Sequence, residues 1–154
     1  MTSLALYALV ASFSIVIAGL AGAAEPGAGT GAMPAVHSHQ GVRYTSGGIG
    51  LDESTAMKAA ASQWPLSLEF AIQTGGRAEY ASNVKVLVRN SQGATVLQAT
   101  SQGPFLLAEL PPGSYQIEAT LGGKTLQRQA TVRSGQSAHV VLEWPAGTDS
   151  PAQK

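Results

Sequence analysis

The stretch GPFLLAELPPGSYQIEA, residues 103–119, has the pattern of a strand, a tight corner and a second strand. Two prolines fix their φ angles and remove two amide donors, which ends the first strand at Leu110. Gly113 supplies the unusual φ angle that a tight reversal often needs. Tyr115 then enters the core, where its hydroxyl group can reach a backbone group near the corner. We therefore interpret one set of residues as a structural corner rather than a catalytic element: Leu110, Pro111, Pro112, Gly113 and Tyr115.

Alternation of apolar and polar residues begins at Leu66 and continues to Trp144. This period of two is typical of strands that bury one face. It predicts seven short strands, at 66–73, 84–89, 95–100, 105–110, 115–119, 126–132 and 138–144. Short strands separated by polar and Gly-rich turns are typical of an antiparallel β-sandwich. We therefore expect an all-β domain over residues 66–145, followed by a disordered tail at 146–154.

Residues 46–65 predict a Gly-rich turn followed by one short helix. Asp52 is expected to cap the helix N-terminus, and Pro65 to end the helix at about Trp64. One face of the helix is apolar, with residues at helical spacing: Met57, Ala60, Ala61 and Trp64. A Gly-rich turn before a helix can bind phosphate, but no strand precedes this turn and no P-loop lysine follows it. We therefore expect the helix to pack on the sheet.

The N-terminal segment has the composition of an export signal. No charged side chain precedes Glu25, and an apolar run extends over residues 4–20. Small residues then lead to a cleavage site after Ala23 or Ala24, which defines a signal peptide at 1–23. The segment has no Lys or Arg near its start, so an uncleaved membrane anchor stays open as the alternative. Cleavage near Ala23 would place the protein in the bacterial periplasm or outside the cell.

Residues 24–45 are rich in Gly, Ala and Pro, and this composition predicts a flexible linker. The linker contains His37 and His39 in the sequence His-Ser-His. Two histidines without a third ligand are a weak metal signal, so metal binding there stays open. We expect no resident cofactor or metal.

Composition excludes several classes of function. The 154-residue chain has no cysteine, so disulfides, thiolate metal sites and thiol catalysis are impossible. Nine Lys and Arg residues balance nine Asp and Glu residues. Nucleic-acid binding needs clustered Lys and Arg residues, and this chain has no excess of them. We therefore expect no nucleic-acid partner. Contact with a membrane is expected only if the N-terminal leader is retained.

The corner and its surroundings resemble a known family. Residues 103–119 have the order of a strand, the motif L-P-x-G-x-Y and a second strand, and the polar turn VRNSQGATV precedes them. This arrangement resembles carboxypeptidase regulatory-like domains. The resemblance covers about residues 66–144. It implies a seven-stranded, prealbumin-like (transthyretin-like) antiparallel sandwich with one short N-terminal helix. The segment from Tyr44 through the helix is similar to the lead-in of small exported proteins of unknown role from Gram-negative bacteria.

The resemblance does not imply peptidase activity, because such domains accompany a peptidase and do not carry its zinc site. The chain has neither an H-x-x-E nor an H-E-x-x-H motif, and it has three histidines in all. Related sandwiches form a Lys–Asn cross-link, but the only asparagines here are Asn83 and Asn90. Hydroxyisourate hydrolases end in Tyr-Arg-Gly-Ser, whereas this chain ends in SPAQK. No serine lies in a G-x-S-x-G turn.

A few side chains are candidates for a binding surface: Trp64, Tyr80, Trp144 and His139. The aromatic residues could stack on a sugar or a peptide, or the two tryptophans could pack at the edge of the core. We expect a non-catalytic module that binds a protein, a peptide or a cell-envelope component through sheet edges or loop ends. The alternative is a structural protein tethered by an uncleaved N-terminal anchor. Third comes an enzyme of unknown type that would use His139, Glu143 and Arg128.

Overall fold

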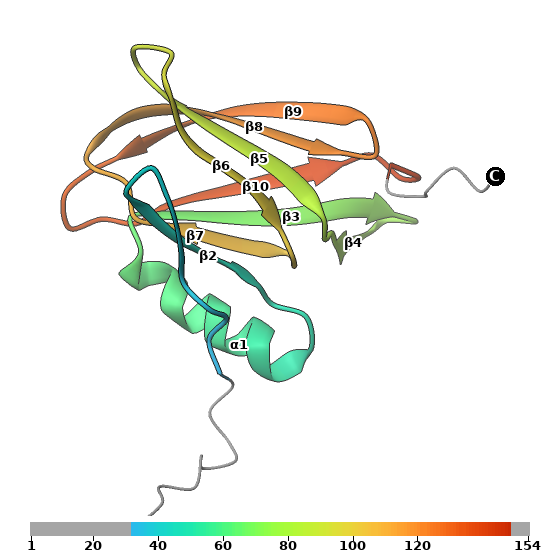
Figure 1. The fold of residues 1–154 in the computed structure, drawn as a ribbon. Helices are drawn as coiled ribbons and strands as arrows, with labels where there is room; N and C mark the ends of the chain where they lie inside the picture. The colour runs from blue at the N-terminus through green and yellow to red at the C-terminus, as the bar shows by residue number, and fades with distance from the viewer. Residues whose placement is uncertain (1–31, 149–154) are drawn as a thin grey trace, which may run out of the picture.

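Two β-sheets pack face to face in the computed structural model of the protein, which describes residues 32–148 (Figure 1). Sheet A has the strand order β1 (His37–His39), β2 (Val42–Gly47), β7 (Phe105–Ala108), β3 (Leu66–Thr74) and β10 (Ala138–Trp144). A short strand, β4 (Arg77–Tyr80), pairs with the second half of β3. Sheet B has the order β6 (Thr95–Ser101), β5 (Val84–Asn90), β8 (Gly113–Leu121) and β9 (Lys124–Val132). The expected all-β sandwich is therefore confirmed.

The number and direction of the strands differ from the prediction. Each of the seven predicted segments contains a strand, but the described residues form ten strands in all. The sheets are also not wholly antiparallel, since β10 runs parallel to β3 from Ala138 beside Leu66 to Trp144 beside Ile72. Alternation along a strand shows which face is buried, but it carries no information about the direction of the neighbouring strand.

The predicted linker at 24–45 is wrong over its second half. Residues 37–47 form the β1–β2 hairpin, whose turn contains Gln40 and Gly41, both with positive φ. Strand β2 pairs with β7, from Tyr44 beside Ala108 to Gly47 beside Phe105. The pairing gives hydrogen-bond partners to the backbone groups at the edge of β7. This outweighs the weak strand propensity of a segment that contains Gly and Ser. The predicted signal peptide at 1–23 lies outside the described residues.

The core lies between the two sheets and contains the inner faces of the predicted strands. Leu66, Leu68 and Phe70 of β3 and Val84 and Val86 of β5 are among its fully buried members. Each buried side chain of this size stabilises the fold by about 1.5–3 kcal/mol relative to an exposed one. The periodicity of the sequence therefore located the core correctly.

Helix α1 (Leu51–Ala60) and a following 3-10 turn (Ala61–Gln63) cover the outer face of sheet A (Figure 1). Met57 is fully buried against Phe105 and Leu107 of β7. Ala60, Ala61 and Trp64 pack around them, so the predicted apolar face is confirmed. Strand β7 is buried on both faces as a result.

The predicted helix cap is wrong. Gly50 precedes the helix, and Asp52 is the second helical residue with no side-chain cap hydrogen bond at this end. Glu53 provides the local contact instead, because its Oε1 accepts a hydrogen bond of 2.7 Å from the backbone N–H of Gly48. The helix begins before Asp52 because Gly48 and Gly50 have positive φ angles, which turn the chain directly into the helix at Leu51.

The segment after β10 is also more ordered than the predicted tail. Thr148 is buried, and its hydroxyl group donates a hydrogen bond of 2.5 Å to the carbonyl oxygen of Pro145. The tail prediction is therefore wrong for residues 146–148, and the remaining residues of it lie outside the described range. Within residues 32–148, no helix has the length and apolar character that are needed to cross a bilayer.

Candidate functional site

The corner joins the two sheets. Strand β7 of sheet A ends at Ala108, and β8 of sheet B begins at Gly113. The hydroxyl group of Tyr115 donates a hydrogen bond of 2.6 Å to the carbonyl oxygen of Pro111. Gly113 is the first residue of β8 and has a positive φ of 159°, so the predicted unusual φ angle at this position is confirmed. Leu110 and Tyr115 are both buried, which makes the corner part of the core.

Trp64 lies beside the corner. It lines a hollow of about 460 Å³ together with Leu110 and Pro112 from the corner and Val132 and Arg133 from the end of β9. Trp64 also lines a smaller hollow of about 130 Å³, together with Arg43 and Glu109, which form an exposed ion pair. The structure therefore brings one predicted binding residue next to the predicted corner.

Trp144 is not a surface residue. Its side chain is fully buried, it packs against Phe70 and its Nε1 donates a hydrogen bond of 3.0 Å to the carbonyl oxygen of Lys124. Trp144 therefore takes no part in a stacking surface, and its packing in the core agrees with the alternative given for the two tryptophans. The alternation of β10 places Trp144 on the same inner face as Leu142, and burial of this face removes the ring from solvent.

Tyr80 is half exposed at the end of β4. Its ring contacts Phe105 edge to face, and the ammonium group of Lys58 lies 5.2 Å from the ring centre. Interaction with Tyr80 is the largest cause that raises the pKa of Lys58, and the charge of Glu69 adds to it. Tyr80 therefore packs against Lys58 of helix α1 and Phe105 of β7, while half of its surface stays exposed.

His139 belongs to a hydrogen-bonded set that the sequence did not reveal. Its Nδ1 lies 3.2 Å from Oγ of Ser67, and its Nε2 lies 3.5 Å from Oε2 of Glu69. The order serine, histidine, carboxylate resembles a nucleophile with its base and an orienting acid. However, only 1% of Ser67 is exposed, so a substrate cannot reach its hydroxyl group. Ser67 and Glu69 were missed because the parallel register of β3 and β10 brings them to His139.

The proposed catalytic partners of His139 lie elsewhere. Glu143 is on the same face of β10 as His139 but four residues further along the strand, beside Ala71 of β3. Its Oε1 is buried and has no hydrogen-bond partner among the described residues. Arg128 is on β9 of sheet B, where its Nη1 donates to the carbonyl oxygen of Gln127 at 2.8 Å. Each of the three residues therefore has different immediate neighbours.

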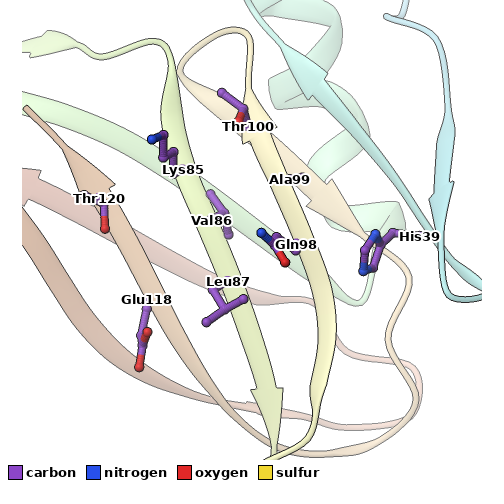
Figure 2. Close-up of a pocket in the computed structure, with 9 residues that line it drawn as sticks. All are labelled: His39, Lys85, Val86, Leu87, Gln98, Ala99, Thr100, Glu118 and Thr120. Atoms are coloured by element: carbon purple, nitrogen blue, oxygen red, sulfur yellow. The ribbon is translucent and has the colours of Figure 1, made fainter.

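A larger hollow, of about 630 Å³, lies on the outer face of sheet B (Figure 2). Figure 2 shows its polar side chains on three neighbouring strands, with His39 from the β1–β2 hairpin at one side: Lys85 of β5, Gln98 and Thr100 of β6, and Glu118 and Thr120 of β8. Glu118 is held by an ion pair of 3.0 Å with Arg89. The lining thus combines both signs of charge with amide and hydroxyl groups.

The sequence contained only part of the signal for this hollow. The residues are the outward members of the predicted strands, so their exposure follows from alternation. Their grouping follows from strand order, because Leu87 lies beside Gln98 on one side and Glu118 on the other. His39 reaches the hollow only because residues 37–47 form a hairpin.

The histidines of that hairpin do not form a metal cluster with other described residues. The ring of His37 packs on the ring of Tyr44, with centres 5.5 Å apart. Within residues 32–148, no three His, Asp or Glu side chains converge on a point that could hold a metal ion.

Comparison with known proteins adds no assignment. No family model and no curated protein matches this chain.

Proposed function

We propose that the protein is an exported, non-catalytic sandwich module of the prealbumin-like, carboxypeptidase regulatory-like type. It acts in the periplasm or outside the cell of a Gram-negative bacterium and binds a protein, a peptide or another envelope component. The two-sheet core and the bond between Tyr115 and Pro111 support the fold type. The L-P-x-G-x-Y corner supports the relationship to regulatory-like domains.

The polar hollow on sheet B is the observation that carries the binding function. Its volume of about 630 Å³ falls within the range of about 300–1,000 Å³ that is common for ligand sites. Lys85 and Gln98 are exposed, so they offer a cation and an amide to a ligand without a change in the core. A lining of amides, hydroxyl groups and both signs of charge suits the polar backbone and side chains of a peptide or protein segment.

The arrangement around His139 supports a role without catalysis. A serine nucleophile must be reached by its substrate, and Ser67 is buried beneath the outer face of sheet A. We expect a fluorophosphonate, which reacts with activated serines, to leave the protein unmodified in intact-mass measurement. Covalent modification at Ser67 would contradict the non-catalytic proposal.

A comparison of three baits tests the binding function. Wild-type protein and the Lys85→Ala variant are each used to capture partners from a periplasmic extract, with Arg77→Ala as the matched control. Arg77 is also an exposed cation, but it lies on β4 of the other sheet. We expect a captured species that is lost with Lys85→Ala and kept with Arg77→Ala. Equal capture by all three baits would remove the hollow from the binding function.

The site of action is tested by the mass of the mature N-terminus. A start at Ala24 or Glu25 would agree with export and cleavage. A protein that keeps residues 1–23 would instead favour the tethered structural alternative, which the apolar run at 4–20 suggests.

A further inference from the structure

The end strand β9 has the longest open edge among the described residues. Five strands pair with a single neighbour: β1, β4 and β10 in sheet A, and β6 and β9 in sheet B. Strand β9 has nine residues, more than any of the other four, and it pairs with β8 alone. An unpaired edge of this length offers a row of backbone donors and acceptors to another strand.

The register of the β8–β9 hairpin shows which groups face outward. The turn has two residues, Gly122 and Gly123, so Leu121 and Lys124 form the closing pair. In an antiparallel pair, residues alternate between those that bond to the neighbour and those that point away. Four residues of β9 therefore direct their backbone groups to the open edge: Thr125, Gln127, Gln129 and Thr131. The contact between Arg128 and the carbonyl oxygen of Gln127 agrees with this assignment.

The open edge is positively charged. Lys124 and Arg128 lie on β9, Arg133 follows it, and all three side chains are exposed. The stretch from 124 to 133 contains no acidic residue. The ion pairs within residues 32–148 involve Arg43, Arg89 and His139 and none of these three cations. The chain as a whole is neutral, so this edge is a local concentration of positive charge.

We propose that β9 binds an extended acidic peptide segment of a partner protein by strand addition. The added strand would extend sheet B, and its carboxylates would pair with Arg128 and the neighbouring cations. The N–H of the added strand would replace Nη1 of Arg128 as the donor to Gln127, which frees the guanidinium group for a carboxylate. The inference rests on the proposed binding function and names the class of partner.

A hollow beside the edge fits this partner. It has a volume of about 190 Å³ and is lined by Gln116, Gln127, Arg128 and Gln129. The amides come from the outer face of sheet B, so a side chain of the added strand would meet hydrogen-bonding groups next to Arg128.

A second copy of the chain fits the edge less well. Antiparallel pairing of two β9 strands would bring two sets of the same three cations together. Like charges across neighbouring strands destabilise the pair, whereas an acidic strand complements it. Charge complementarity therefore favours an acidic partner over self-association.

Three synthetic nonapeptides test the proposal with the wild-type protein. One alternates Thr and Glu, the second alternates Thr and Lys, and the third is the acidic peptide with N-methyl groups on every backbone nitrogen. Binding is measured by isothermal titration, and amide hydrogen exchange locates the contact. We expect only the unmodified acidic peptide to bind and to slow exchange at the outward residues of β9. Equal binding of the N-methylated peptide would overturn strand addition, because neither of its edges has a backbone N–H to donate to β9.

Charge reversal provides the second test. We expect Arg128→Glu to weaken binding of the acidic peptide by at least about tenfold and to improve binding of the basic one. Arg77→Glu makes the same charge change on β4 of sheet A, away from β9, and should leave a much smaller effect. Folding of both variants is checked by thermal denaturation. Equal effects of the two variants would show that net charge alone attracts the peptide and would overturn the proposal.

The results separate this inference from the proposed function. If the bait comparison depends on Lys85 but the acidic peptide does not bind, the edge inference fails and the proposed function stands. If the peptide binds at β9 but no bait captures a species that depends on Lys85, the hollow is not the binding site. The inference that β9 binds an acidic strand is then kept. A dimer of the protein alone with slow exchange at β9 would overturn the acidic partner in favour of a second copy.

Discussion

The hydroxyl group of Tyr115 donates a hydrogen bond of 2.6 Å to the carbonyl oxygen of Pro111, four residues earlier in the chain. Tyr115 lies on β8 of sheet B, and Pro111 lies in the connection from β7 of sheet A. The bond therefore fixes the point at which the chain passes from one sheet to the other.

Replacement of Tyr115 by Phe should remove this bond and keep the ring in the core. We expect the free energy of unfolding to fall by about 1 kcal/mol, the usual net contribution of one intramolecular hydrogen bond. Urea denaturation of the wild type and the variant measures the difference. Peptide binding at β9 should be unchanged, and an equally stable variant would contradict the structural role of the hydroxyl group.

The contribution of Tyr115 should depend on alkaline pH. Burial raises the pKa of Tyr115 above its ordinary value of 10.0, because the folded protein favours the neutral phenol. Because the pKa is higher in the folded state, the unfolded protein loses the phenolic proton first as the pH rises. The stability that the neutral phenol contributes is therefore complete below the unfolded-state pKa. It is lost as the pH rises through the folded-state pKa. We therefore expect the wild type to lose stability relative to Tyr115→Phe above about pH 10. A pH-independent difference would contradict this expectation.

Gly103→Ala should destabilise the fold through a backbone contact. Gly103 does not have a positive φ, but a Cβ atom there would collide with the backbone of Gly47 at the end of β2. The collision involves main-chain atoms that cannot rotate away, so we expect a loss of about 1–3 kcal/mol. Gly75→Ala is the matched control, since its Cβ would meet no atom and only its positive φ opposes the change. A larger loss at Gly75 than at Gly103 would argue against close packing of Gly47 and Gly103.

The two tryptophans should differ in their access to solvent. Trp144 is fully buried, whereas Trp64 is partly exposed beside the corner hollow. Because the chain has two tryptophans, each single Trp→Phe variant reports on the other one. We expect acrylamide to quench the fluorescence of Trp144→Phe strongly, and that of Trp64→Phe weakly with emission at shorter wavelength. Similar quenching of the two variants would contradict the burial of Trp144.

The sequence predicted the features that depend on local pattern. Alternation of apolar residues located the inner faces of β3, β5 and β10, and helical spacing located the face of α1 that carries Met57. The prolines and Tyr115 predicted the corner. These predictions succeeded because each depends on the geometry of a single strand or helix. A strand repeats every 2 residues and a helix every 3.6, so the spacing of apolar residues along the chain shows which face is buried.

The pairing of distant segments could not be predicted in this way. The β1–β2 hairpin forms because β7 has an edge to satisfy, although its own composition favours a linker. The contact of His139 with Ser67 and Glu69 requires the parallel register of β10 on β3. The same is true of the hollow on sheet B, whose residues come from three strands and a hairpin.

The amino-acid sequence by itself determined the all-β class, the buried faces of the strands, the corner and the exclusion of thiol chemistry. Only the tertiary structure decided that Ser67 is out of reach beside His139 and that β9 is an open, positively charged edge. The physical reason is that hydrophobic alternation depends on neighbours along one strand. Strand order and direction depend on hydrogen bonds between residues that are far apart in the chain.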